Sequence, residues 1–334
     1  MTICVLGAGS WGIALANYCS GMGHDVRLWE FDPDAARKLA VTRQREEMLK
    51  GIRLLDSIHV TSDLAEAIAD AGLLLLVVPS HVVRSVLQQL AQLDLNSTTL
   101  IVNCAKGIEI ETLNRISEIV AQELSPFLAS RYSVLSGPSH AEEVSKRIPT
   151  AVVVASADEL VGRFVQQTLN GATFRIYRSQ DVAGVELGGS LKNVIAIAAG
   201  ICDGAGFGDN TKAALQPRGL AEMSRLGKKL GANPLTFSGL SGMGDLIVTC
   251  MSRHSRNRYL GEEIGKGVKL TEVLASMTMV AEGVRTCRAT MELARREGVE
   301  MPISKKVYEI LFEDKDPKEA LHDLLSREAK PEIW

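Results

Sequence analysis

The chain has 334 residues, which is too long for most single hydrophobic cores and favours two domains. With 46% hydrophobic and 23% charged residues, it has the composition of an ordinary globular protein. Its net charge of −3 and its 4% of aromatic residues argue against a nucleic-acid surface. We therefore expect neither nucleic acid nor a membrane among its partners.

The six cysteines are far apart, at positions 4, 19, 104, 202, 250 and 287. They form no CxxC pair and show no metal-ligand spacing, so no metal site is predicted. Scattered cysteines of this kind usually behave as small hydrophobic residues in a reducing compartment. The N-terminus carries no charged leader, and apolar runs such as residues 194–202 are far shorter than the ~20 residues that span a bilayer. We expect a cytoplasmic protein.

The most informative local pattern is a glycine-rich turn near the N-terminus. A strand is predicted over residues 3–6, followed by GAGSWG over residues 7–12, a helix over 13–20 and a strand over 25–29. This is G-x-G-x-x-G, with Gly7, Gly9 and Gly12, inside a β-α-β unit. Glycines are needed because a side chain would keep a pyrophosphate away from the helix N-terminus. The pattern predicts a dinucleotide-binding site.

Glu30 ends the second predicted strand. A carboxylate at this place accepts a hydrogen bond from the ribose 2′-hydroxyl and repels a 2′-phosphate, which favours NAD over NADP. No basic residue follows before Arg37, although the sequence does not place Arg27 or Arg37 relative to Glu30. The alternative is that Glu30 and Asp32 are solvated acids of a turn, so NAD and NADP both stay open.

Further strands are predicted over residues 59–61, 73–78, 100–104, 133–135, 151–155 and 174–177. They alternate with helices that we expect over 63–70, 81–93 and 112–124. The result is a sheet of about eight strands, a doubly wound α/β fold of the Rossmann type over residues 1–180. Lys106 follows one strand, at the edge where such sheets bind ligands, but it could equally be a solvated loop lysine.

From Asp181 onward strand signals give way to helical ones, which predicts a helical domain over residues 181–334. Lys192 lies in its first segment, among small and aliphatic residues. Burial there would favour the neutral amine and make it usable as a base, whereas a lysine reaching into water is the alternative. Small-residue loops are expected over 203–210 and over 238–246, which contains Asp245. Two surface helices are expected over 302–328.

The segment 252–258, SRHSRNR, carries three arginines. It is short, lacks aromatic residues and belongs to an acidic protein, so nucleic acid is a poor candidate for its ligand. Arginine suits bidentate capture of a phosphate, and a phosphate monoester on a small substrate fits better. A solvated helix face is the alternative.

Eight segments occur in order across nearly the whole chain: GAGSWG, CAKGIE, SGPSHAEEV, GVELGGSLKNVIAIAAGI, NTKAAL, GLSGMGDL, SRNR and VAEGV. In these segments the chain resembles the bacterial NAD(P)-dependent glycerol-3-phosphate dehydrogenases. The resemblance implies hydride transfer between sn-glycerol 3-phosphate and dihydroxyacetone phosphate with NAD or NADP. Such an enzyme would supply glycerol 3-phosphate for glycerophospholipid synthesis. We also expect a homodimer, which a largely helical second domain favours.

The resemblance assigns roles to individual residues. Lys192 corresponds to the proton acceptor and donor, and Lys106 to a lysine that touches both cofactor and substrate. For Asp245 we add the hypothesis that it orients Lys192 or a substrate hydroxyl. Substrate contacts are implied for Lys106, Gly137, Ser139, Lys192, Asp245, Ser255, Arg256 and Asn257. Cofactor contacts are implied for Ser10, Trp11, Lys106, Ala141, Arg256, Val280 and Glu282, besides the three glycines and Glu30.

Two positions depart from the family pattern. Phe31 stands where members often carry His or Arg, and Gln216-Pro217 replaces an aliphatic residue and Thr ahead of Arg218. Proline removes a backbone donor and disturbs a helix, which leaves the geometry near Arg218 open. Two other functions are compatible with the sequence. One is a dehydrogenase of the same architecture, of the 6-phosphogluconate or ketopantoate type, and the other is a non-catalytic dinucleotide sensor.

Overall fold

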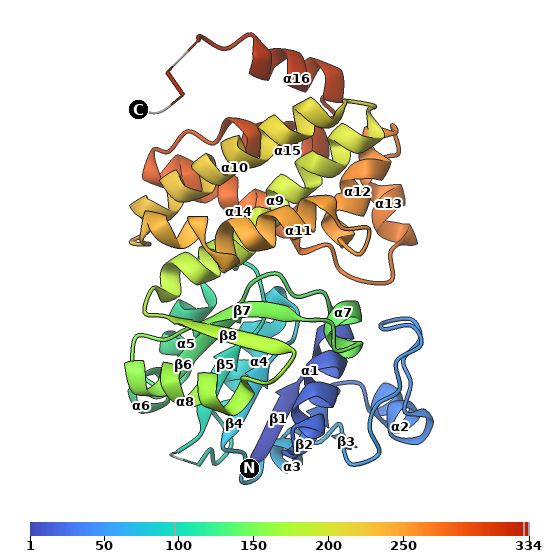
Figure 1. Cartoon of the computed structure of the whole chain (residues 1–334), viewed down its shortest axis with the longest axis vertical. Coiled ribbons are helices and arrows are strands. Elements are labelled where there is room, and N and C mark those ends of the chain that lie inside the picture. Colours follow the sequence, from blue (N-terminus) through green and yellow to red (C-terminus); the bar gives the residue numbers. More distant parts are fainter. Residues whose placement is uncertain (97, 330, 333–334) are drawn as a thin grey trace.

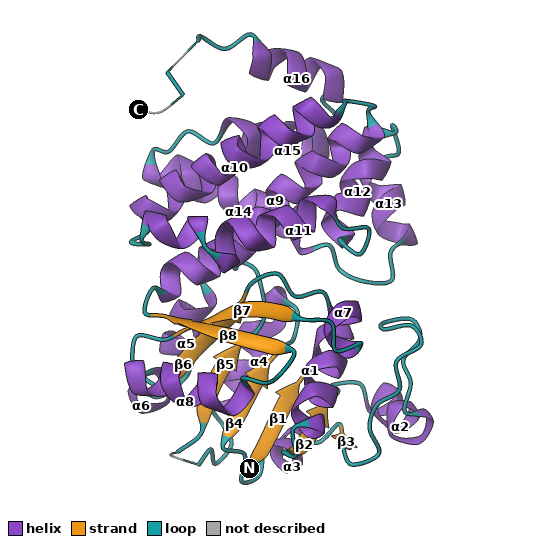
Figure 2. Cartoon of the chain, viewed as in Figure 1, coloured by secondary structure: helices purple, strands orange, loops and turns teal. Residues whose placement is uncertain are grey.

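The computed structural model describes residues 1–96, 98–329 and 331–332. A sheet flanked by helices occupies the lower half of Figure 1, and a group of helices occupies the upper half. Figure 2 shows the same division by element type, with every strand in the lower half. The last described helix, labelled α16, lies at the end of the helical half that is farthest from the sheet.

One mixed sheet of eight strands forms the first part of the chain. Its spatial order is β3-β2-β1-β4-β5-β6-β7-β8, and each neighbouring pair is parallel except β6 with β7. The direction of winding therefore reverses at β1, between β2 and β4, which is where open α/β sheets bind their ligands. The predicted Rossmann-type sheet is confirmed. Its strands are β1 (Thr2–Leu6), β2 (Asp25–Trp29), β3 (His59–Thr61), β4 (Leu73–Leu76), β5 (Leu100–Asn103), β6 (Tyr132–Ser136), β7 (Thr150–Ala155) and β8 (Phe174–Ser179).

Helices cover both faces of this sheet and bury its apolar side chains in two separate cores. These helices are α1 (Ser10–Gly21), α2 (Pro33–Thr42), α3 (Leu64–Ile68), α4 (Val83–Leu90), α5 (Ile116–Glu123), α6 (Pro126–Ala129), α7 (Ala141–Ser145) and α8 (Glu159–Leu169). The prediction of a helix over 112–124 was wrong at its start. Leu113 has a positive φ of 63°, which a helix excludes, and α5 begins only at Ile116.

From Val182 on, the described elements are helical. They are α9 (Val182–Gly204), α10 (Asp209–Lys229), a 3₁₀ turn (Pro234–Ser238), a π-helical turn (Leu240–Gly244), α11 (Asp245–Met251), α12 (Arg256–Gly265), α13 (Leu270–Ser276), α14 (Glu282–Glu297), α15 (Pro302–Phe312) and α16 (Pro317–Leu325). The loop predicted over 203–210 is shorter, because α9 and α10 extend into it. The loop predicted over 238–246 is largely replaced by the π-helical turn. Helix α10 continues through Pro217.

Helix α9 is the centre of the helical part, and every residue from Gly184 to Cys202 is buried. It packs against α10, α11, α12 and α14. A Cβ on Gly200 would lie 1.9 Å from the carbonyl oxygen of Arg258, so α9 and α12 touch through their backbones. By length and composition α9 could cross a membrane, but its apolar window is entirely buried within the protein.

A buried carboxylate joins α9 to the sheet. Glu186 accepts hydrogen bonds from Tyr132 Oη at 2.6 Å, from the backbone and hydroxyl of Ser117 at 2.8 and 2.7 Å, and from Arg115 Nη1 at 3.0 Å. Burial raises the pKa of Glu186, while Arg115 and the hydrogen bonds oppose this rise. The first helix of the second part is thus fixed to β6 and α5 close to its start.

Candidate active site

The glycine-rich turn between β1 and α1 has the shape that a dinucleotide requires. Gly7 has a φ of +115°, and a Cβ on Gly12 would lie only 1.8 Å from the carbonyl oxygen of Gly7. Gly9 precedes α1, makes no side-chain cap, and has open space where a Cβ would stand. The first N–H groups of α1 are therefore left to an external acceptor such as a pyrophosphate. The residues present fit the cofactor.

Two loops approach the first turn of α1. The hydroxyl of Ser10 donates to the carbonyl oxygen of Met48 at 2.5 Å and lies 3.2 Å from the sulfur of Met279. The indole of Trp11 packs against Phe174, with 6.4 Å between the ring centroids. Ser10 thus lies where segments from both halves of the chain meet. The cofactor contacts assigned to Ser10 and Trp11 stay predictions.

Glu30 is buried at the end of β2 and forms an ion pair that the sequence did not predict. Its Oε2 accepts from Arg45 Nη1 at 2.5 Å, and its Oε1 accepts from the backbone N–H of Asp32 at 3.3 Å. Arg45 belongs to the segment between α2 and β3, 15 residues further along the chain. No local pattern links the two residues, so only the folded chain could reveal the pair.

Lys106, Lys192 and Asp245 form one cluster between the sheet edge and the helices. Asp245 lies at the start of α11 and accepts from Lys106 Nζ at 2.6 Å and from Lys192 Nζ at 2.9 Å. Lys106 follows β5 and also donates to the carbonyl oxygen of Gly137 at 3.1 Å. Lys192 lies in the middle of α9 and is 6% exposed. The structure thus brings together four residues that the sequence had singled out.

Burial and neighbouring charges set the protonation of this cluster. Burial lowers the pKa of Lys192 to about 8, with a further lowering by the ammonium of Lys106 and an opposing effect of Asp245. Burial alone would raise the pKa of Asp245, but the two lysines outweigh it and hold that pKa below its usual range. An amine with a pKa of about 8 is partly deprotonated near neutral pH, which suits it to general acid–base catalysis.

Thr249 is a fourth member of the cluster and was missed in the sequence. Lys192 Nζ donates to the Thr249 hydroxyl at 2.6 Å, and this hydroxyl donates to the backbone carbonyl oxygen of Asp245 at 2.6 Å. Thr249 lies four residues after Asp245 on α11, a spacing that puts both side chains on one helix face. That spacing was a signal that could have identified it.

The segment after β6 supplies further polar groups. The hydroxyl of Ser139 donates to the carbonyl oxygen of Gly137 at 3.0 Å, and Ala141 is the buried first residue of α7. His140 lies between them, and its Nε2 is buried without a hydrogen-bond partner in the described part of the chain. Burial lowers the pKa of His140, and the charge of Lys192 adds to this effect. A neutral imidazole is therefore available to a polar ligand.

The predicted phosphate-binding residues differ in their exposure and in the hydrogen bonds that they already make within the protein. Arg256 opens α12 and is exposed, whereas Ser255 is buried and caps that helix by accepting from the backbone N–H of Arg258 at 3.2 Å. Asn257 is also buried. Its amide donates to Asn193 Oδ1 at 3.0 Å and accepts from the backbone N–H of Gly283 at 2.9 Å. Asn257 thus holds α9, α12 and α14 together, and its predicted substrate contact remains to be tested.

Two of the predicted cofactor contacts lie at the N-terminus of α14. Val280 is partly exposed, at 39%, whereas Glu282 faces the sheet. The carboxylate of Glu282 accepts from the backbone N–H of Ser80 at 3.0 Å and from its hydroxyl at 2.6 Å. Ser80 follows β4 beside the switch point, so Glu282 connects the helical part to the edge where the cofactor is expected. Among the described residues no group of His, Cys, Asp or Glu side chains could hold a metal ion.

Comparison with known proteins gives a consistent result over the whole chain. The family model described as NAD-dependent glycerol-3-phosphate dehydrogenase N-terminus matches residues 2–161, and the model for the C-terminus matches residues 181–322. A protein of Chlorobium phaeobacteroides (strain BS1) named glycerol-3-phosphate dehydrogenase [NAD(P)+] is 51% identical over 333 residues, covering 100% of this chain and 99% of that protein. A Geobacter sulfurreducens protein of the same name is 51% identical over 330 residues, covering 99% and 98%.

Solved structures agree with the sequence matches. The crystal structure of glycerol-3-phosphate dehydrogenase from Coxiella burnetii superimposes with a TM-score of 0.92 at 37% identity, covering 98% of this chain and 99% of that one. A ketopantoate reductase from Ralstonia eutropha reaches a TM-score of 0.62 at 13% identity, which shows a shared fold alone. The chain belongs to the NAD-dependent glycerol-3-phosphate dehydrogenase family.

Proposed function

We propose that this protein interconverts sn-glycerol 3-phosphate and dihydroxyacetone phosphate with NAD or NADP as the redox partner. The observation that carries the proposal is the buried cluster in which Asp245 binds both Lys192 and Lys106, beside the edge of a dinucleotide-type sheet. The family of the chain supports the same reaction. The product of the reductive direction would serve glycerophospholipid synthesis.

Lys192 would take the proton of the substrate hydroxyl in oxidation and return it in reduction. In the structure its Nζ donates to Asp245 and to Thr249. A neutral amine keeps two N–H donors for these partners and has one lone pair left, which can accept the hydroxyl proton. With a pKa lowered to about 8, chiefly by burial, Lys192 can work in either direction near neutral pH.

The glycine-rich turn and the first turn of α1 would hold the pyrophosphate, and Glu30 the ribose of the adenosine. Lys106, Val280 and Glu282 would hold the nicotinamide half, a role supported by the hydrogen bonds of Glu282 to Ser80 after β4. When bound, the nicotinamide accepts or supplies the hydride. Lys106 would also orient the substrate, because its ammonium reaches Asp245 and the Gly137 carbonyl oxygen at once.

Arg256 would bind the phosphate of the substrate. It is an exposed residue at the first position of α12, where the helix dipole also favours an anion. Ser255 would fix the start of α12 as its N-cap. Asn257 would keep α12 in place against α9 and α14. Gly137 and Ser139 would line the same space from the side of the sheet.

An absorbance assay tests this function. Purified protein with NADH and dihydroxyacetone phosphate should lose absorbance at the nicotinamide wavelength, and a parallel assay with NADPH measures cofactor choice. A non-catalytic sensor would bind NADH without oxidising it. A dehydrogenase of the ketopantoate type would oxidise NADH with ketopantoate and leave dihydroxyacetone phosphate untouched.

We also propose a cytoplasmic homodimer. All six cysteines are buried and unpaired in the described structure, which fits a reducing compartment. A groove of about 1350 Å³ between α16 and helices α10 and α15 is lined by apolar residues such as Ile310, Leu321 and Leu324. A second copy that covers it would remove this apolar surface from water. Light scattering after gel filtration should give twice the chain mass of 36.1 kDa, and a monomer mass would exclude the dimer.

A further inference from the structure

We infer that Arg45 and Glu30 together form the site for the 2′-position of the adenosine ribose and let one protein accept either a 2′-hydroxyl or a 2′-phosphate. The inference rests on the proposed dinucleotide site and assigns a specificity-determining role to Arg45. It is carried by the contacts of the segment between α2 and β3.

Arg45 connects the two parts of the nucleotide site. Its Nη1 donates to Glu30 Oε2 at 2.5 Å and to the carbonyl oxygen of Ala8, in the glycine-rich turn, at 3.0 Å. Its side chain is 18% exposed and that of Glu30 is 6% exposed. The guanidinium therefore lies against the end of β2, where the ribose of a dinucleotide is bound in this fold.

Other basic residues near β2 are engaged elsewhere. Arg27 donates to the carbonyl oxygens of Glu66 and Ala69 at the end of α3. Arg37 is an exposed residue of α2 paired with Asp34. Phe31, next to Glu30, brings no charge and is 74% exposed. Arg45 thus supplies the positive charge that residues 27, 31 and 37 do not supply beside Glu30.

The pair explains how a carboxylate at this place need not exclude NADP. A lone Glu30 would repel a 2′-phosphate, whose charge is about −2. The charge of Arg45 offsets that of Glu30, and a guanidinium can bind a phosphate through two nitrogens. Only Nη1 and Nε of Arg45 are used within the described residues, which leaves Nη2 for a ligand. With NAD, Glu30 can accept the hydrogen bond of the 2′-hydroxyl.

Direct binding of two fragments tests the pair without turnover. Calorimetric titration of the purified protein with 5′-ADP and with 2′,5′-ADP isolates the effect of the 2′-phosphate. We expect the wild type to bind both with affinities within about tenfold of each other. Arg45→Ala should weaken 2′,5′-ADP by at least about tenfold, the cost of one charge-assisted contact, and change 5′-ADP less than about threefold.

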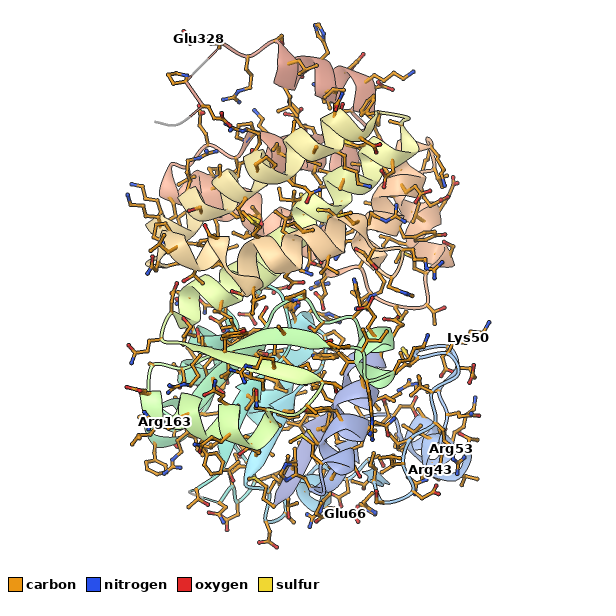
Figure 3. The ribbon with its side chains drawn as sticks, in the orientation of Figure 1. Arg43, Lys50, Arg53, Glu66, Arg163 and Glu328 are labelled. Carbon is orange, nitrogen blue, oxygen red and sulfur yellow. The ribbon has the colours of Figure 1, made fainter. Side chains whose placement is uncertain are left out.

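Glu30→Gln should strengthen the binding of 2′,5′-ADP, because it removes the charge that repels the 2′-phosphate and releases Arg45. Binding of 2′,5′-ADP should become tighter relative to 5′-ADP. Arg53→Ala is the matched control, because Arg53 lies on the same loop, is exposed and pairs with Asp56 instead. Figure 3 shows Arg53 and Arg43 near α2 and Lys50 at the tip of that loop. The control should leave both affinities unchanged.

Specific results would overturn the inference. Equal weakening of both fragments by Arg45→Ala would show a structural role of the arginine. Should that variant not fold, Glu30→Gln decides alone, and an unchanged ratio of the two affinities excludes the pair as a specificity site. Absence of 5′-ADP binding to the wild type would remove the dinucleotide site itself, and with it the proposed function.

Discussion

The glycine-rich turn and the lysine cluster are built in opposite ways. The turn uses backbone groups from a few consecutive residues. A Cβ on Gly7 or Gly12 would crowd the neighbouring backbone, and one on Gly9 would occupy open space beside the helix N-terminus. The cluster uses side chains that come from α9, from α11 and from the loop after β5. A site made by consecutive backbone can be recognised in sequence from its spacing, whereas a site made by distant side chains depends on the whole fold.

The glycine-rich turn and the lysine cluster also differ in how much charge they bury. The turn binds with N–H groups that are already at the end of a helix, so no charge is buried before the ligand arrives. The cluster buries the amine of Lys192 and the carboxylate of Asp245 and partly buries the ammonium of Lys106. The removal of any one of them leaves its partners with a buried charge imbalance. Substitutions in the cluster should therefore change protonation and rate, and substitutions in the turn should change binding.

The largest effect is expected for Lys192→Met, which removes the proton acceptor and keeps an apolar chain of similar length. We expect kcat to fall at least about a hundredfold, in line with the loss of positioned proton transfer, and binding of 5′-ADP to stay intact. Steady-state rates and calorimetry measure the two quantities. Lys305→Met, at an exposed lysine of α15, is the control and should retain activity. Retained turnover in Lys192→Met would remove this residue from the mechanism.

Gly12→Ala, in the glycine-rich turn, should mainly weaken nucleotide binding, whereas Lys192→Met should mainly lower kcat. The new methyl group would lie 1.8 Å from the carbonyl oxygen of Gly7, so the turn must move and the N–H groups of α1 lose their arrangement. Loss of about two charge-assisted hydrogen bonds would weaken 5′-ADP by about a hundredfold. Gly208→Ala is the control, because a Cβ added at Gly208 would have no other atom within 4 Å. Unchanged binding in Gly12→Ala would exclude the turn as the pyrophosphate site.

Arg256→Ala tests whether the phosphate is bound apart from the reacting centre. The KM for dihydroxyacetone phosphate should rise at least about tenfold, while kcat changes less, because one charge-assisted contact is lost in ground and transition states alike. The neighbouring exposed Arg253→Ala provides the control. Should KM stay the same in Arg256→Ala, the phosphate must bind elsewhere.

The smallest effect concerns the pH profile of glycerol 3-phosphate oxidation. The neutral form of Lys192 is the base, so kcat/KM should rise with pH through about 8 and then level off. The Asp245 carboxylate raises the pKa of Lys192, so in Asp245→Asn the rise should move to lower pH. A loss of orientation should also reduce the maximal rate by about tenfold. Rates measured from pH 6 to 10 for both proteins give the pH at which kcat/KM is half-maximal. If that pH is the same in Asp245→Asn as in the wild type, Asp245 does not control the pKa of Lys192.

Much of the fold followed from the sequence, because strands of a parallel sheet are continuous apolar runs bounded by turns. The eight strands and the change to helices near Asp181 are examples. Small-residue segments were less predictable. The stretch over 240–244 forms a π-helical turn because Gly242 packs against the backbone of Phe237, where a Cβ would lie 2.1 Å from its carbonyl oxygen. Helix α9 also approaches this turn, since a Cβ on Gly188 would lie 2.6 Å from the carbonyl oxygen of Ser241, so tertiary packing contributes to the conformation.

The catalytic candidates were identified chiefly by family resemblance, since a lysine in an apolar segment has no unique meaning. Thr249 and Arg45 show what was missed. Thr249 had a local signal in its spacing from Asp245, whereas Arg45 reaches Glu30 only because the loop after α2 folds back onto the glycine-rich turn. Hydrogen-bond partners across loops depend on the path of the chain, which composition and periodicity do not encode.

The ion pair between Lys106 and Asp245 links the pKa of Lys192 to the contact between the sheet and the helical part. Lys106 belongs to the sheet and Asp245 to the helical part, so this contact exists only while the two are together. If they moved apart, Lys192 would lose the neighbouring positive charge that lowers its pKa but would keep the carboxylate that raises it. The pKa of its amine would then be higher, and less of the neutral form would be present near neutral pH. The basicity of Lys192 therefore depends on how closely the sheet and the helical part are held together at this contact.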